Sequence, residues 1–238
     1  MSHDSAAITA VLWLGPLPLT ETVLTTWGNM LALVAAAWLL VRHPALLPSR
    51  KQTLAESILV AIEQAIAEVV PENAVRPVLP FVATLWLFIL CANLTGLIPG
   101  LHAPTRDLSA TAALALLVFG STHWYGIRTK GLRSYLKHYV EPSPILAPFH
   151  ILSEITRTLA LAIRLFGNIM SLEMAALLVL MIAGFLVPVP LLMLHVIEAV
   201  VQAYIFGTLA LIYIAGAIEP DENATSTDSP EHPIKEKS

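Results

Sequence analysis

The strongest constraint on the fold of this chain is a set of long apolar stretches that contain no charged residue. Residues 22–41, 78–98 and 108–127 hold no Asp, Glu, Lys or Arg. Each stretch is close to the length of about 20 residues that a helix needs to cross a bilayer core. The chain of 238 residues is 56% hydrophobic and 13% charged, whereas about a quarter of the residues of a soluble domain are charged. The sequence therefore predicts an integral membrane protein.

Two longer apolar segments, residues 145–187 and 191–218, follow these stretches and are separated by a Pro-Val-Pro sequence. A helix over residues 149–186 would be about 57 Å long, nearly twice the bilayer core of about 30 Å. Ordinary helix tilts average only about 20°. We therefore expect the last two helices to be long and strongly tilted against a partner surface.

Residues 52–70 differ from these spans because their apolar residues lie on one helical stripe. The stripe consists of Leu54, Ile58, Ile62, Ile66 and Val69. This pattern predicts an amphipathic helix on the membrane surface. The predicted fold class is an all-α membrane protein with five transmembrane helices and this surface helix, in a single membrane domain over residues 22–218. The polar tail, residues 219–238, is predicted to be disordered.

The loops between the predicted spans differ sharply in charge. One side of the membrane receives Arg42, Arg50, Lys51, Arg76, Arg128, Lys130, Arg133 and Lys137. The other side receives only Arg106. By the positive-inside rule the first side is cytoplasmic. The N-terminal segment, residues 1–21, is then outside, and the tail is in the cytoplasm.

Several function classes find no support in the sequence. The formal net charge of −4 indicates no nucleic-acid partner, and the single cysteine, Cys91, gives neither a disulfide nor a metal-binding spacing. No nucleotide-binding loop, zinc-protease motif or nucleophile elbow occurs. We expect no catalytic residue, no cofactor and no metal site, so the chain is not expected to be an enzyme on its own.

The ionisable residues of the spans are concentrated in the last two segments. They are Glu154, Arg157, Arg164, Glu173, His195 and Glu198, accompanied by the amide of Gln202. Charge inside a membrane is costly and usually marks a functional path. Arg164 is too far from either end of its apolar run to reach the interface easily. The asparagines of the other spans, Asn29 and Asn93, are expected to be helix-packing residues.

Helical geometry separates Arg164 from the nearest carboxylate that follows it. Arg157, Arg164 and Asn168 share one face, because they are spaced seven and four residues apart. Glu173 is nine residues after Arg164, about 13 Å along the helix and on its opposite side. We therefore expect no salt bridge between Arg164 and Glu173.

On the last helix, His195, Glu198 and Gln202 form one polar stripe. We expect this stripe to face Glu173 and to line an aqueous crevice that opens to the outer side. Carboxylate and imidazole groups can pass protons along water, whereas arginine cannot release its proton. Arg164 is therefore suited to block proton passage between two half-paths and to attract a carboxylate.

The segments LALAIRLFGNIM (159–170) and EAVVQAYIFGTLALIYIAGAIE (198–219) resemble subunit a of the F-type ATP synthases. The segment NLTGLIPGLHAPTRDLSATAALAL (93–116) resembles the same family. The resemblance extends from about Trp27 to Glu219, which is nearly the whole predicted membrane part.

This resemblance implies a stator subunit with two proton half-channels beside a rotating ring of c subunits, which couples proton flow to ATP synthesis or hydrolysis. It also implies b-type peripheral stalk subunits and other ATP synthase subunits as partners, in a bacterial cytoplasmic (inner) membrane. Arg164 matches the family's essential arginine. Asn168, Glu173, His195 and Gln202 match the polar residues that the family places around it.

The sequence departs from the family pattern at the cytoplasmic side. His150 takes the place of a frequent glutamate, Arg157 lies in a segment without the usual proline, and Glu198 is an extra carboxylate. We expect the inner half-channel near His150, Glu154 and Arg157. Sodium in place of protons is an alternative, because the coupling site is chiefly on the c subunit. A self-contained ion channel or transporter and a structural membrane anchor are further alternatives.

Overall fold

The computed structural model describes residues 10–14, 17–41, 50–98, 100–135, 147–183 and 188–218. Its helices are α1 (Glu21–Val41), α2 (Arg50–Ala67), α3 (Glu72–Thr95), the short η1 (Pro104–Arg106), α4 (Leu108–Lys130), α6 (Ala147–Ala183) and α7 (Pro188–Ile218). Within these ranges, five helices are long and apolar enough to cross a membrane, namely α1, α3, α4, α6 and α7. The predicted all-α class with five spans is therefore confirmed. The predicted disordered tail lies outside the described residues.

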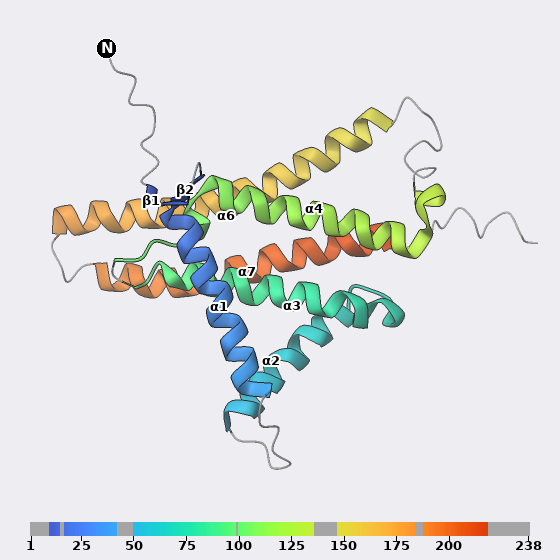
Figure 1. The fold of residues 1–238 in the computed structure, drawn as a ribbon, viewed down its shortest axis with the longest axis horizontal. Helices are drawn as coiled ribbons and strands as arrows, with labels where there is room; N and C mark the ends of the chain where they lie inside the picture. Colours follow the sequence, from blue (N-terminus) through green and yellow to red (C-terminus); the bar gives the residue numbers. More distant parts are fainter. Residues whose placement is uncertain are drawn as a thin grey trace, which may run out of the picture.

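Four of the long helices, α3, α4, α6 and α7, run lengthwise beside one another, and α1 crosses them steeply (Figure 1). The 21 residues of α1 give a length of about 31 Å, whereas the 37 residues of α6 give about 55 Å. The length of α1 matches the thickness of a bilayer core of about 30 Å, whereas α6 is nearly twice as long. A helix as long as α6 crosses such a core only if it is strongly tilted or extends beyond it.

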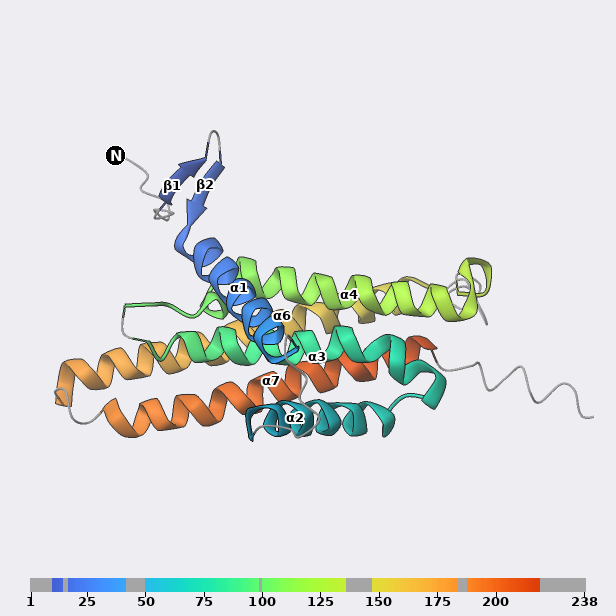
Figure 2. The same ribbon diagram turned by 60° about the horizontal axis from the view of Figure 1, so that its bottom comes forward.

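A β-hairpin precedes α1 and was not expected from the sequence. Strand β1 (Ala10–Leu14) pairs antiparallel with β2 (Leu17–Thr20). Figure 2 shows this hairpin extending from the start of α1, away from the layers of long helices. The hairpin adds a small β element outside the spans and leaves the helical membrane part unchanged.

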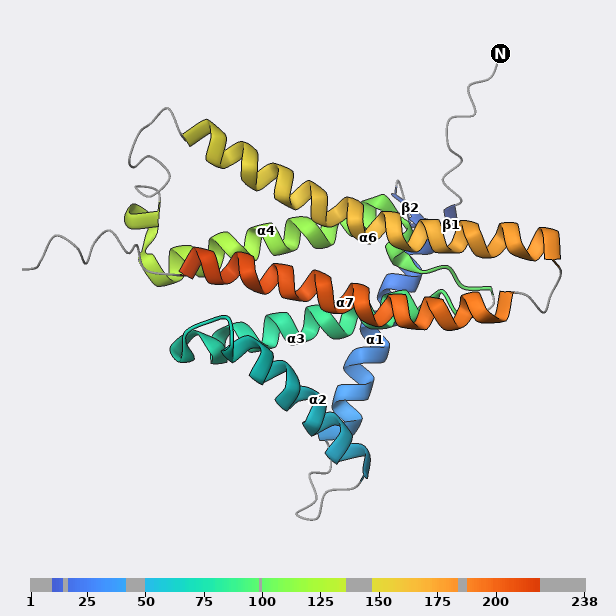
Figure 3. The ribbon, with the colours of Figure 1, turned by 180° about the vertical axis from the view of Figure 1, so that it is seen from behind.

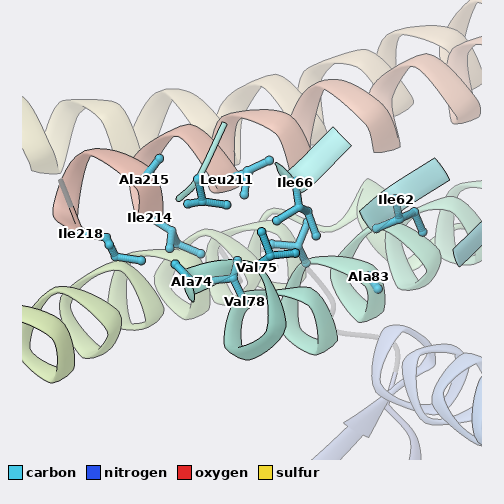
Figure 4. Packing of buried hydrophobic residues seen from close by; sticks show 12 residues of the cluster. Ile62, Ile66, Ala74, Val75, Val78, Ala83, Leu211, Ile214, Ala215 and Ile218 are labelled. Atoms are coloured by element: carbon cyan, nitrogen blue, oxygen red, sulfur yellow. The ribbon is translucent and has the colours of Figure 1, made fainter. Parts of the chain in front are cut away.

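The helix α2 lies against the bundle through only part of its apolar stripe. Ile62 and Ile66 are buried, whereas Leu54 and Ile58 are exposed. The buried residues join a cluster with α3 and α7 (Figure 4). Its buried members are Ile62, Ile66, Val70, Ala74, Val75, Val78, Val82, Ala83, Leu211, Ile214, Ala215 and Ile218. The C-terminal half of the amphipathic helix is therefore fixed to the bundle by apolar burial.

A second core joins α3, α4, α6 and α7. Among its largest fully buried side chains are Ile89 from α3, Leu161 and Leu165 from α6, and Phe206 from α7. Seen from behind, α6 and α7 lie in front of α3 and α4 (Figure 3). One long face of this helix pair is therefore left uncovered by the other helices.

Close contact between α3 and α7 depends on a glycine. The indole ring of Trp86 on α3 lies over Gly207, and a methyl group at Gly207 would overlap that ring. The same indole ring contacts the ring of Tyr204 at a centroid distance of 5.9 Å. The absence of a side chain at Gly207 therefore allows α7 to pack directly on Trp86.

We predict that Gly207→Ala destabilises the α3–α7 contact, because the added methyl group displaces the indole of Trp86. A rearrangement of this kind in a packed core costs about 1–3 kcal/mol. The measurement is the thermal unfolding midpoint of the detergent-solubilised protein. Gly120→Ala is the matched control, because a methyl group at Gly120 meets nothing within 4 Å. Equal midpoints for the two variants would contradict this role of Gly207.

Candidate functional site

The side chain of Arg164 is exposed on the outside of the helical bundle, in the middle of α6. The neighbouring residues Leu161 and Leu165 are buried, so this part of α6 has one packed side and one open side. Within the described parts of the chain, the guanidinium group makes no hydrogen bond and no ion pair. The exposed cation therefore has no partner in the chain as described.

The surface around Arg164 is apolar. Helix α6 exposes Leu152, Ile155, Leu159, Ile163, Met174 and Leu177, and α7 exposes Leu194, Ile197, Val200, Val201 and Tyr204. Large exposed apolar patches usually mark contacts with a membrane or with another protein. A single charge on such a surface is costly in lipid, which favours a protein partner that carries an opposite charge.

One turn beyond Arg164, a side-chain hydrogen bond joins the two long helices. Asn168 Nδ2 donates to Gln202 Oε1 over 2.6 Å. Gln202 is only 1% exposed, and among the described residues its Nε2 atom has no partner. Leaving a buried donor unpaired is destabilising. The pair fixes α6 against α7 beside Arg164 and does not contact the guanidinium group itself.

His195 lies on the buried side of α7 and contacts α3. Its Nε2 atom donates to the backbone carbonyl of Asn93 over 3.2 Å. The side chain of Asn93 is fully buried and accepts a hydrogen bond of 2.7 Å from Thr105 Oγ1 in η1. His195 therefore links α7 to α3 and, through Asn93, to the segment that precedes α4.

Glu173 forms an ion pair with the loop between α3 and α4. Arg106 Nη1 donates to Glu173 Oε2 over 3.0 Å. The two residues line a cavity of about 710 Å³, together with His102, Asp107 and Glu21. This cavity is at the end of the bundle where α3 ends and where α1 and α4 begin. His195 and Glu198 are not among the residues that line this cavity.

A second cavity is at the opposite end of the bundle. It has a volume of about 300 Å³ and is lined by His150, Glu154 and Arg157 from α6 and by Tyr213 from α7. Glu154 Oε1 is 3.5 Å from Nε2 of His123 on α4. The guanidinium of Arg157 lies 4.6 Å from the centre of the Tyr213 ring. The three residues expected for an inner path are thus brought together.

Among the expected residues, the structure places Glu198 half-buried on α7 and leaves it outside both cavities. The sequence analysis did not identify the pairing of Arg106 with Glu173 or of His123 with Glu154. Arg106 is the single Lys or Arg in the loops on its side, and this isolation could have predicted that it pairs with a carboxylate. The described residues contain no group of three or more His, Cys, Asp or Glu that could hold a metal ion.

The fold and these residues define a multi-pass membrane protein with a cavity at each end of a long helical hairpin and an exposed arginine between them. The profile of the ATP synthase A chain family matches residues 23–215. This chain belongs to that family, as the sequence resemblance predicted.

Curated relatives agree with this assignment. The chain is 59% identical to ATP synthase subunit a 1 of Hahella chejuensis over 227 residues, which are 95% of this chain and 96% of the relative. It is 62% identical to ATP synthase subunit a 2 of Pelobacter propionicus over 210 residues, 88% of this chain and 92% of the relative. A subunit a from Legionella pneumophila is 58% identical over 217 residues, 91% of this chain and 94% of the relative.

Asp107 caps the first turn of α4 at the cavity that Glu173 and Arg106 line. Its carboxylate accepts hydrogen bonds from Ser109 N, Ser109 Oγ and Thr22 Oγ1. Partial burial raises the pKa of Asp107, but these hydrogen bonds and the charge of Arg106 outweigh it, so the pKa lies below its ordinary value. The capping carboxylate therefore remains ionised and also ties α1 to α4.

We predict that Asp107→Ala lowers the stability of the protein by about 1 kcal/mol, because the cap of α4 is lost. A lowered folded-state pKa contributes stability that is present above the ordinary pKa of about 4 and is lost only as the pH falls through the lowered value. The deficit in thermal midpoint should therefore be constant from neutral to mildly alkaline pH. Asp107→Asn, which can still cap, should lose less; equal losses would contradict the capping role.

Proposed function

We propose that this chain is the ion-translocating stator subunit of an F-type ATP synthase, with two proton half-channels against a rotating ring of c subunits. Its family consists of membrane-sector subunits of a multi-subunit complex, and ATP synthesis and proton transport follow from that membership. The chain contributes no catalytic group of its own to ATP chemistry. Other ATP synthase subunits are its partners, and it is a multi-pass protein of a bacterial inner membrane.

The observation that carries this proposal is the exposed Arg164 on the apolar face of α6 and α7. An arginine in hydrocarbon is costly without a partner, and the described chain gives it none. A carboxylate on a passing c subunit supplies the opposite charge, and Arg164 favours the ionised form of that carboxylate. Because arginine cannot release its proton, it also prevents protons from leaking directly between the two half-channels.

The two cavities are suited to be the half-channels. The outer path contains Glu173 and the larger cavity, with His195 and Glu198 acting from the α7 side. The inner path contains His150, Glu154 and Arg157. Arg164 is about 10 Å along the helix from Arg157 and about 13 Å from Glu173, between the two paths. Asn168 and Gln202 hold the two helices together beside Arg164.

The uncovered face of α6 and α7 is the surface for the c-ring in this proposal, and b-type stalk subunits contact other faces. The inner cavity is at the cytoplasmic side in this proposal, with the N-terminus outside and the C-terminus inside, and the basic loops support this orientation. One charge that crosses 100 mV gains about 2.3 kcal/mol. Several such steps must therefore be combined for each ATP, and a rotating ring combines them.

We predict that Arg164→Ala abolishes ATP-driven acidification of inverted membrane vesicles, because the barrier between the half-channels and the counter-charge for the ring are both lost. The assembled complex should remain present on native gels, since the side chain is exposed. Arg76→Ala, which removes another exposed arginine outside α6 and α7, is the control and should transport normally. Normal acidification by the Arg164→Ala complex would refute the proposed function.

The coupling ion is tested by ATP hydrolysis in the intact complex, with and without added sodium chloride at matched ionic strength. For protons we expect equal rates and a pH gradient that a protonophore removes. Strong stimulation by sodium, with sodium uptake that survives a protonophore, would select the alternative in which sodium takes the same path. Conduction by the purified chain alone in liposomes would indicate a self-contained channel.

A further inference from the structure

The carboxylate proposed to receive ions on the outer side is already paired with a permanent cation. Arg106 Nη1 is 3.0 Å from Glu173 Oε2, and the side chains are 43% and 16% exposed. Both residues line the outer cavity. Since Arg106 remains protonated at all physiological pH values, any ion that binds Glu173 has to compete with it.

A second contact holds the guanidinium group of Arg106 in this position. The same Nη1 atom is 2.8 Å from Nδ1 of His102, one turn earlier in the loop. Because arginine only donates hydrogen bonds, His102 accepts here and its Nδ1 atom carries no proton. His102 thus provides a second contact for the same Nη1 atom that pairs with Glu173.

The backbone that carries Arg106 is itself anchored in the bundle. Arg106 ends η1, where Thr105 is buried and bonded to Asn93. Asp107, the next residue, is fixed by Ser109 and Thr22. An arginine on such a segment can move its side chain without moving its backbone. The ion pair between Arg106 and Glu173 can therefore open by movement of the Arg106 side chain alone.

Two other carboxylates line the same cavity. They are Glu21 at the start of α1 and Asp107, the residue that follows Arg106. Their negative charge keeps the surroundings of Arg106 favourable for a cation when its guanidinium leaves Glu173. With His102, they complete the set of titratable groups that line the cavity in the described chain.

We propose that Arg106 is a displaceable counter-ion of Glu173, which the incoming coupling ion must replace at the outer entrance. The proposal rests on the proposed function, in which Glu173 belongs to the outer path. Arg106 is a positioning residue: it acts through Glu173 and sets the ion concentration at which the outer path fills. When the ion moves on, the guanidinium returns and prevents the carboxylate from retaining it.

The experiment measures ATP synthesis by the complete complex in inverted vesicles at a fixed membrane potential. The luminal concentration of the coupling ion, H⁺ or Na⁺ as identified above, is varied. Arg106→Gln should lower the half-saturating concentration by about threefold to tenfold, because one charged contact no longer competes. Arg106→Lys, which keeps the charge, should remain close to the unsubstituted protein.

Two further variants test whether Arg106 acts through Glu173. Glu173→Gln removes the carboxylate, and adding Arg106→Gln to it should cause no further shift. Glu173→Asp keeps a carboxylate but shortens it, and should reproduce the direction of the Arg106→Gln shift. Glu173→Asp replaces Glu173→Gln if ATP synthesis by the Glu173→Gln complex is too slow for a half-saturating concentration to be measured.

A loss of complex or of maximal rate with an unchanged half-saturating concentration would reduce Arg106 to a structural role and overturn the proposal. A shift in the opposite direction, or an equal shift in the Glu173→Gln background, would overturn it as well. These failures differ from failure of the proposed function, which appears as normal transport by the Arg164→Ala complex.

Discussion

An arginine that faces away from its own protein is the constraint on which the rest of this structure depends. In the described chain, the guanidinium of Arg164 has no carboxylate partner, although Glu173 follows on the same helix. Helix geometry prevents that pairing, because nine residues turn the carboxylate to the opposite side. Glu173 pairs with Arg106 instead. The cost of an uncompensated charge in an apolar surface then has to be met from outside the chain, and in the proposed function a carboxylate of the c-ring meets it.

The guanidinium of Arg164 can act on a partner only if its position is fixed. The packing of α7 against the bundle fixes that position. His195, Ala199, Gln202 and Phe206 are all buried and recur at helical spacing, so one face of α7 is held against the bundle. The hydrogen bond between Asn168 and Gln202 joins α6 to that fixed helix one turn from Arg164. Neighbouring side chains thereby restrict α6 while the opposite face remains open. A rigid supporting shell of this kind is what a precisely positioned functional group requires.

The sequence predicted most of the fold but only part of the site. Apolar length identified the five spans, and residue spacing correctly separated Arg164 from Glu173. The predicted span began at residue 78 because the charge-free stretch begins only after Arg76, whereas α3 begins at Glu72 and includes Arg76, Pro77 and Pro80. Periodicity shows which face of a helix a residue occupies, but it does not show which neighbour covers that face. For this reason the contacts of His195 with α3 and of Glu173 with Arg106 became visible only in three dimensions.

The two cavities pair acids with bases of different kinds, and this difference gives the two paths different chemistry. At the inner end of the proposed path, Glu154 Oε1 is 3.5 Å from Nε2 of the His123 imidazole. At the outer end, Glu173 is beside an arginine that cannot exchange its proton. There the carboxylate alone can take up an ion, and the cation can only yield or return. In the proposed function, the inner path therefore pairs an acid with an imidazole, and the outer path pairs an acid with a guanidinium group that keeps its proton.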